Sequence, residues 1–139
     1  MKTIIQDNNN FVLRFDKDEE VFEGLVKFMK EQQVAACAFN GIGASSSVEL
    51  GYFNPFIKEY RKKPYVEELE IIAFSGNGSF SGADHSIHAH GMFGRTDFSV
   101  FGGHVFKLVV SVTCEIFLTK LSGQMKREMN SDFNLNLLV

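Results

Sequence analysis

Residues 104–118 read His104-Val-Phe-Lys-Leu-Val-Val-Ser-Val-Thr-Cys-Glu-Ile-Phe-Leu118 and form the longest alternating run in the chain. Every even position from 106 to 118 carries an apolar side chain, whereas the odd positions include Lys107, Ser111, Thr113 and Glu115. Because successive side chains of a strand point to opposite faces, this run predicts a long strand whose even face lies on a hydrophobic core. In the same phase, His104 points to the core face and lies at the edge of the core.

Shorter runs elsewhere also predict strands, because their apolar or alternating residues are bounded by Gly, Asn, Asp or Ser. These runs cover residues 11–15, 34–39, 47–53, 69–74 and 87–93. The segment after Gly123 alternates weakly and is a candidate for one more strand. Gly41 and Gly43 lack the third glycine and the following helix of a dinucleotide-binding loop, so we expect a bulge or a close backbone contact there.

One segment of the chain predicts a helix. From Glu19 to about Gln32, apolar side chains recur at helical spacing, and Asp16 to Glu19 offers a capping box ahead of them. One helix and six or more strands, without the strand–helix alternation of a doubly wound fold, predict an α+β fold. We expect a mainly antiparallel β-sheet packed with one principal helix. A length of 139 residues and a hydrophobic content of 45% suit a single domain over residues 1–139.

The composition of the chain limits the cellular compartments and the binding partners that we expect. The chain has 14 basic and 17 acidic residues, and its net charge of −3 mildly repels nucleic acid, so DNA binding needs a local basic patch. No apolar stretch approaches the roughly 20 residues of a membrane span, and none resembles a signal-peptide core. Cys37 and Cys114 lie in apolar runs and form no Cys-x-x-Cys pair, which indicates a reducing compartment. We expect a cytoplasmic protein that makes no membrane contact.

Three histidines are the strongest candidates for chemistry. His88 and His90 are two residues apart, so on a strand they share a face with Cα atoms roughly 6.5–7 Å apart. His104 follows two glycines and can supply a third imidazole from a neighbouring strand. Three imidazoles with an open fourth position favour zinc, with other first-row divalent ions as alternatives. Such a site can acidify a bound water, or it can simply hold strands together; the same residues also suit plain hydrogen-bonded strand positions.

A basic cluster is the other candidate site. It consists of Lys58, Arg61, Lys62 and Lys63, interleaved with tyrosines, and it can contact phosphates. The alternative is a solvated loop or hairpin, because neighbouring glutamates dilute its field. Glu115 is a carboxylate to consider as a base, but on an ideal strand it faces away from His104 and suits a charge pair better.

Several short motifs occur in an order that is characteristic of one family. They are Gly41-Ile-Gly43, Leu50-Gly-Tyr-Phe53, Glu70-Ile-Ile-Ala-Phe-Ser-Gly-Asn77, His88-Ala-His90, Gly102-Gly-His104 and Thr113-Cys-Glu115. Together they resemble the PPC domain of plants and prokaryotes from about residue 11 to about residue 133, where Arg127 and Asp132 also match. The resemblance implies an α+β domain that assembles as a homotrimer, with zinc bound by the three histidines. It also implies a DNA-binding description, although this chain has no Arg-Gly-Arg-Pro hook for the minor groove.

Three functions follow as hypotheses. The first is a trimeric, DNA-associated regulatory or interaction protein whose histidine site is structural or senses a ligand. The second is a zinc-dependent enzyme or small-molecule binder that uses the same histidines on an unknown substrate. In the third, the glycines serve turns and the histidines only support subunit packing.

Overall fold

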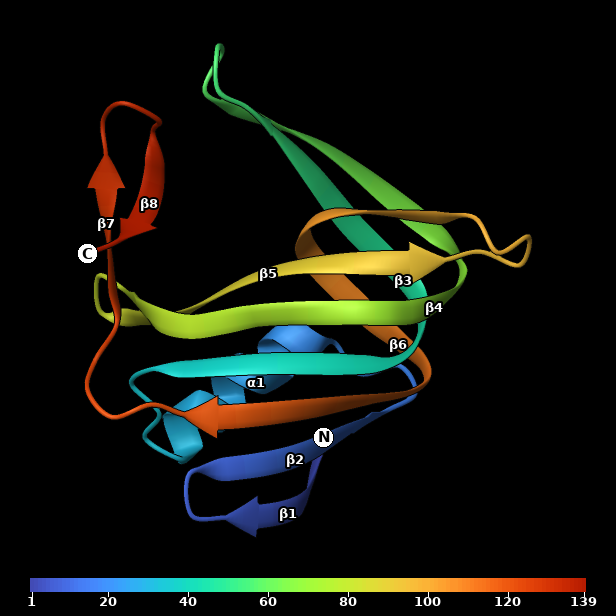
Figure 1. Ribbon diagram of the computed structural model, residues 1–139, viewed down its shortest axis with the longest axis horizontal. Coiled ribbons are helices and arrows are strands. Elements are labelled where there is room, and N and C mark those ends of the chain that lie inside the picture. The colour runs from blue at the N-terminus through green and yellow to red at the C-terminus, as the bar shows by residue number, and fades with distance from the viewer.

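The computed structural model describes residues 1–139 and contains one eight-stranded sheet and one helix (Figure 1). The elements are β1 (Lys2–Asp7), β2 (Asn10–Asp16), α1 (Val21–Glu31), β3 (Cys37–Asn54), β4 (Glu59–Ser81), β5 (Asp84–Gly94), β6 (Val100–Lys120), β7 (Lys126–Asn130) and β8 (Leu135–Leu138). All strand pairs are antiparallel except β4 with β7. The predicted α+β class, with a mainly antiparallel sheet and one helix, is confirmed. No helix has the length and apolar character needed to cross a membrane.

Four strands form a closed circuit of pairings. The sheet order is β1-β2-β6-β3-β4-β7-β8, and β5 pairs with both β4 and β6. Because β3 also pairs with β4 and β6, the circuit runs β3, β4, β5, β6 and back to β3. The far ends of β3 and β4 extend beyond this circuit as a two-stranded arm (Figure 1). The β7–β8 hairpin lies across from this arm in the same view.

The core lies between the sheet and α1, which is behind β3 and β6 in Figure 1. Leu25, Phe28 and Met29 of α1 are buried in this core, as the helical spacing predicts. The helix begins one residue after Glu20, whose carboxylate accepts from the Glu23 N–H and from the Leu108 N–H of β6. The predicted capping residues do interact, since the Glu19 carboxylate accepts from the Asp16 N–H, but the N-cap is Glu20. Both cysteines are buried and unpaired.

Bulges interrupt both β3 and β6. β3 begins at Cys37 and joins the second half of the run predicted at 34–39 to the run predicted at 47–53, with the expected irregularity between Gly41 and Gly43. In β6, Leu50 pairs with Val105 and Glu49 with Lys107, so Phe106 is an extra residue in the ladder. The extra residue reverses the alternation before it: Val105 is 1% exposed and takes the core position. His104 therefore faces away from the core, and its predicted placement on the core face is wrong.

Candidate metal centre

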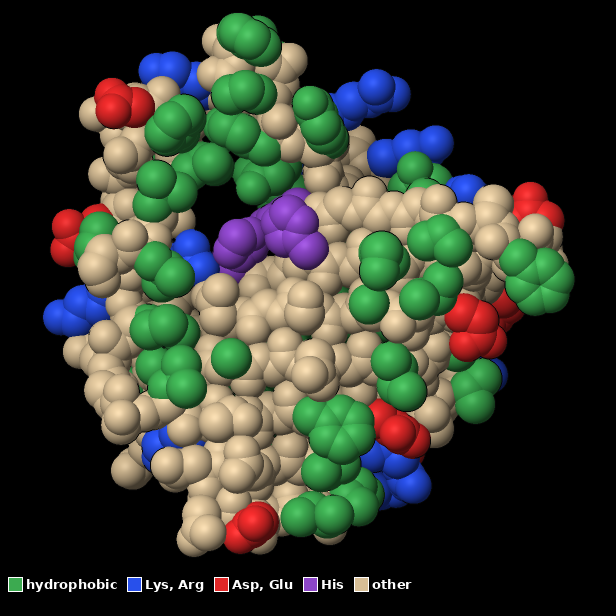
Figure 2. Space-filling view, viewed as in Figure 1, with side chains coloured by type: hydrophobic (Ala, Val, Ile, Leu, Met, Phe, Trp, Pro, Cys, Tyr) green, Lys and Arg blue, Asp and Glu red, His purple; other side chains and the backbone are tan.

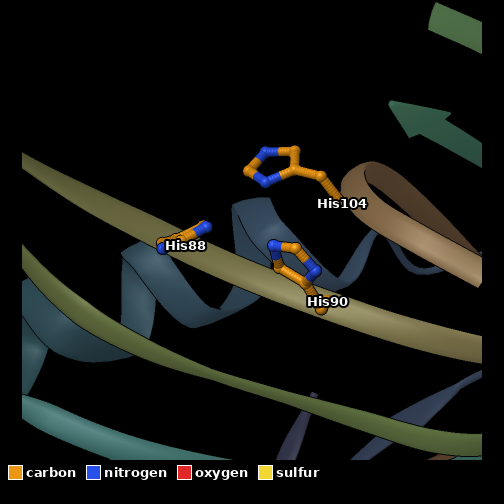
Figure 3. Close-up of side chains that lie close together, drawn as sticks. All are labelled: His88, His90 and His104. Atoms are coloured by element: carbon orange, nitrogen blue, oxygen red, sulfur yellow. The ribbon is translucent and has the colours of Figure 1, made fainter. Parts of the chain in front are cut away.

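The three histidines converge from two adjacent strands. His88 and His90 flank Ala89, which is buried in the core, so both imidazoles point to the opposite face of β5. His104 is the direct cross-strand partner of His90 in the β5–β6 pairing. One ligand nitrogen from each ring lies within 4.8 Å of the other two, and the ring centroids are 5.0–5.3 Å apart (Figure 3). The predicted grouping is therefore present in the fold.

Glycines allow β5 and β6 to approach closely beside this cluster. Gly91 pairs with Gly103, and Met92 pairs with Gly102, in the residues adjoining the His90–His104 pair. A Cβ atom on Gly102 would collide with the carbonyl oxygen of Gly91. The glycine pair before His104 thus has a steric role, because any larger side chain at position 102 forces the two strands apart.

The surroundings of the cluster favour neutral imidazoles. Burial is the main cause that lowers the pKa of His104 to about 4, and the positive charges of His88, His90, Lys62 and Arg127 add to it. Burial likewise lowers the pKa of His88, with smaller contributions from Arg127 and His90. A neutral imidazole keeps a lone pair free for a metal ion at pH 7. The Nδ1 atom of His104 is also buried without a hydrogen-bond partner, which is costly unless something else binds there.

A cavity of about 230 Å³ adjoins two of the histidines. Figure 2 shows the histidines at the edge of a hollow that is ringed largely by hydrophobic side chains. The residues that line it come from β4, β5, β6, β7 and β8, and they are Tyr60, Ser86, Ile87, His88, His104, Arg127, Leu135, Asn136 and Leu137. His104 reaches this cavity from the face of β6 that points away from the core.

The sequence does not predict that Arg127 and Tyr60 belong to this site, although Arg127 is among the positions that match the family. Arg127 enters because β7 pairs in parallel with the end of β4, where Ser81 and Arg127 are partners. Its Nη2 atom lies 3.4 Å from Nδ1 of His88. Tyr60 lies in the arm, and its ring centroid is 5.0 Å from that of His104. No local pattern in the sequence predicts either contact, since both depend on pairings between segments far apart in the chain.

The basic cluster does not form one surface. Arg61, Lys62 and Lys63 are consecutive in β4, so Lys62 points to the opposite face of the arm from the other two. The Lys62 ammonium lies 3.7 Å from the centre of the Phe106 ring and 3.7 Å from Oε1 of Glu49. Lys58 lies in the turn at the tip, where its ammonium donates to the Ser131 carbonyl. The four residues therefore lie on one β-hairpin, and Arg61 and Lys63 share a face of it.

The comparisons with known proteins identify the family. The model of the Plants and Prokaryotes Conserved (PCC) domain matches residues 4–122. The chain belongs to this family. The PCC domain is the one also abbreviated PPC, so the resemblance based on the ordered motifs is confirmed. A search of the curated proteins finds no match to the chain.

Several solved structures are similar to this protein over nearly the whole chain. A metal-containing protein from Archaeoglobus fulgidus is 33% identical, with a TM-score of 0.89, and the match covers 100% of this chain and 99% of that one. A plant- and prokaryote-conserved protein from Pyrococcus horikoshii is 30% identical, with a TM-score of 0.90 and coverage of 100% and 97%. A candidate DNA-binding protein from Bacteroides thetaiotaomicron is 29% identical, with a TM-score of 0.93 and coverage of 97% and 94%.

Proposed function

We propose that this PCC-domain protein binds one transition-metal ion, zinc in the first place, through His88, His90 and His104. The observation that carries the proposal is the convergence of three ligand nitrogens within 4.8 Å of one another. The lowered pKa of His104 supports the proposal, because a neutral imidazole can bind a metal ion. Its Nδ1 atom also supports it, because a buried nitrogen without a hydrogen-bond partner is costly unless it binds something else. The metal-containing relative from Archaeoglobus fulgidus, at 33% identity, adds support. Zinc held by three imidazoles keeps a fourth position open for water or an anion.

A zinc titration tests this proposal directly. Protein stripped with a chelator and then dialysed is titrated with zinc in competition with a chromogenic indicator. We expect saturation at one ion per chain, with an affinity that falls as the pH drops because protons compete for the imidazoles. Binding that is no tighter than that of a variant lacking all three histidines would reject the site.

We further propose that residues 1–139 act as one domain of a cytoplasmic homotrimer. The face of the sheet opposite α1 carries apolar side chains that nothing in the chain covers. Ile42, Ile72 and Phe117 line one groove on this face, and Val112 lines an adjoining one. These four residues are 46–65% exposed, and exposed apolar patches of this kind are typical of subunit interfaces. The threefold symmetry is what membership of the family implies.

Phe117→Asp is expected to dissociate the trimer, because a carboxylate in an apolar interface loses its hydration without gaining a partner. Sedimentation equilibrium should give the mass of three chains for the wild type and of one chain for the variant. Ile57→Asp, an equally drastic change in the exposed turn at the tip of the arm, serves as the control. A monomeric wild type would contradict the trimer, and a trimeric Phe117→Asp would exclude this face.

The role that we propose for the trimer is DNA-associated regulation or interaction. Support comes from the relative in Bacteroides thetaiotaomicron that is described as a candidate DNA-binding protein. Within this chain, Arg61 and Lys63 are exposed on one face of the arm, where they can reach phosphates. Lys62 points the other way and Lys58 lies at the tip, so these two contribute less to that face.

A mobility-shift titration over a range of salt concentrations tests direct contact with DNA. The double variant Arg61→Ala/Lys63→Ala is expected to bind more weakly and to reduce the slope of log K against log salt by about 0.9 per lost contact. Lys27→Ala/Lys30→Ala, on the exposed side of α1, is the matched control. If the wild type forms no complex even at low salt, the chain does not bind DNA directly.

A second candidate function is that of a metal-dependent enzyme or small-molecule binder. The observation that favours it is the cavity of about 230 Å³ that shares His88 and His104 with the proposed metal site. A ligand in this cavity lies within reach of the open coordination position.

A further inference from the structure

We propose that the cavity beside the three histidines binds a small aliphatic carboxylate and that Arg127 is the residue that holds its carboxylate group. The inference deepens the proposed metal site and rests on it for the tightest binding, but Arg127 belongs to the cavity independently of any ion.

Arg127 carries a positive charge that no acidic residue of the chain neutralises. Its guanidinium donates from Nε to Oγ of Ser79 at 3.0 Å and from Nη2 to Oδ1 of Asn77 at 2.8 Å. Its Nη1 atom donates to the carbonyl oxygen of Asn136 at 3.2 Å. These acceptors are neutral, and Arg127 takes part in none of the ion pairs of the structure. A partly buried guanidinium that is fixed in place and lacks a counterion is suited to bind an anion.

The cavity as a whole is electropositive. No Asp or Glu lines it. The permanent charges close enough to act on His104 are those of Lys62 and Arg127, and both are positive. A divalent ion at the histidines would add two more positive charges within a short distance of Arg127, whose Nη2 atom lies 3.4 Å from Nδ1 of His88. An anionic ligand is the natural compensation, since opposite charges interact strongly in a partly desolvated site.

The residues that line the cavity favour an aliphatic group in the part of the ligand outside its carboxylate. Ile87 of β5 and Leu135 and Leu137 of β8 provide an aliphatic surface, and Tyr60 closes the side towards the arm. A volume of about 230 Å³ is below the usual range of roughly 300–1,000 Å³ for drug-sized ligands, so the occupant is small. A carboxylate with a short aliphatic chain can satisfy both the guanidinium and this apolar wall. Inorganic phosphate is also an anion that a guanidinium can bind, but it has no apolar part to pack against the leucines.

Binding of straight-chain monocarboxylates, from acetate to hexanoate, tests the inference. Isothermal titration is performed on the zinc-loaded full chain and on Arg127→Met, which keeps an unbranched apolar stem and removes the charged guanidinium. We expect affinity to rise with chain length up to the size of the cavity and to fall about tenfold or more in Arg127→Met, because a charge-assisted hydrogen bond is lost. Zinc content is measured for both proteins, so that carboxylate binding is compared at equal metal loading. Arg14→Met, on β2, is the control and should bind like the wild type.

Each result decides the matter. Equal carboxylate binding by the wild type and Arg127→Met, or no binding of any acid in the series, overturns the inference while leaving the zinc site intact. Phosphate that binds as tightly as the best carboxylate overturns the choice of ligand. If the wild type takes up no zinc, the metal proposal fails, and the same titration on metal-free protein still decides the role of Arg127.

Should Arg127→Met not fold, the Nε–H resonance of Arg127 in ¹⁵N-labelled wild type must shift on addition of butyrate. A resonance that stays in place rejects the contact.

Discussion

His90→Ala is expected to lower the affinity for zinc by more than about 100-fold. Loss of a residue that merely orients a ligand already costs about 10–100-fold in metal affinity, and His90 is itself one of only three proposed ligands. Its side chain is exposed, so its removal leaves no hole in the core, and the fold should be retained. The competition titration with the chromogenic indicator measures the change, and circular dichroism verifies the fold.

His85→Ala is the matched control, because the chain has four histidines and this one lies outside the cluster. His85 is also on β5, where its ring packs on Phe80 with centroids 4.4 Å apart. It should bind zinc as tightly as the wild type. Equal losses in the two variants would show that zinc binds nonspecifically. Undiminished binding by His90→Ala would favour the hypothesis that the histidines serve packing alone.

Gly102→Val is expected to destabilise the fold and weaken zinc binding together. The new Cβ meets the carbonyl oxygen of Gly91, so β5 and β6 must separate beside the His90–His104 pair. Overpacking of this kind typically costs about 1–3 kcal/mol in the free energy of unfolding. Ligand geometry tolerates little displacement, so zinc affinity should drop at least about tenfold as well. Urea unfolding at fixed protein concentration and the zinc titration measure the two effects.

Gly94→Ala, at the end of the neighbouring strand β5, controls for the loss of a glycine. Its added Cβ would meet the terminal methyl group of Ile72 at 3.0 Å, which a flexible side chain can accommodate. We expect a cost below about 1 kcal/mol and unchanged zinc affinity. A Gly102→Val protein that binds zinc like the wild type would show that the close approach of the strands does not position His104.

Local patterns in the sequence predict the elements well, and they predict the grouping of the histidines. The spacing of His88 and His90 places both on one face wherever residues 87–93 form a strand, whatever the topology. The helix is predictable for the same reason, because its apolar spacing is a local pattern that does not depend on pairings with distant segments. The long run at 104–118 was correctly identified as a strand. These features depend on backbone geometry alone.

Features that depend on pairings between distant segments could not be predicted. The bulge at Phe106 reverses the face of His104, and only the register with β3 reveals it. Arg127 reaches the cavity through a two-residue parallel pairing of β7 with β4, which leaves no periodic signal in either segment. The basic cluster was visible in the sequence, but the division of Lys62 from Arg61 and Lys63 follows from the arm, whose strand extends well beyond the predicted run at 69–74.

We expect each chain of a symmetric assembly to hold one metal ion through its three histidines. Elemental analysis and oligomeric mass, measured on one sample purified without chelator, show whether it does. We predict one zinc ion, or another first-row divalent ion in its place, per chain and a mass of three chains. A trimer or monomer without stoichiometric transition metal would refute the metal site.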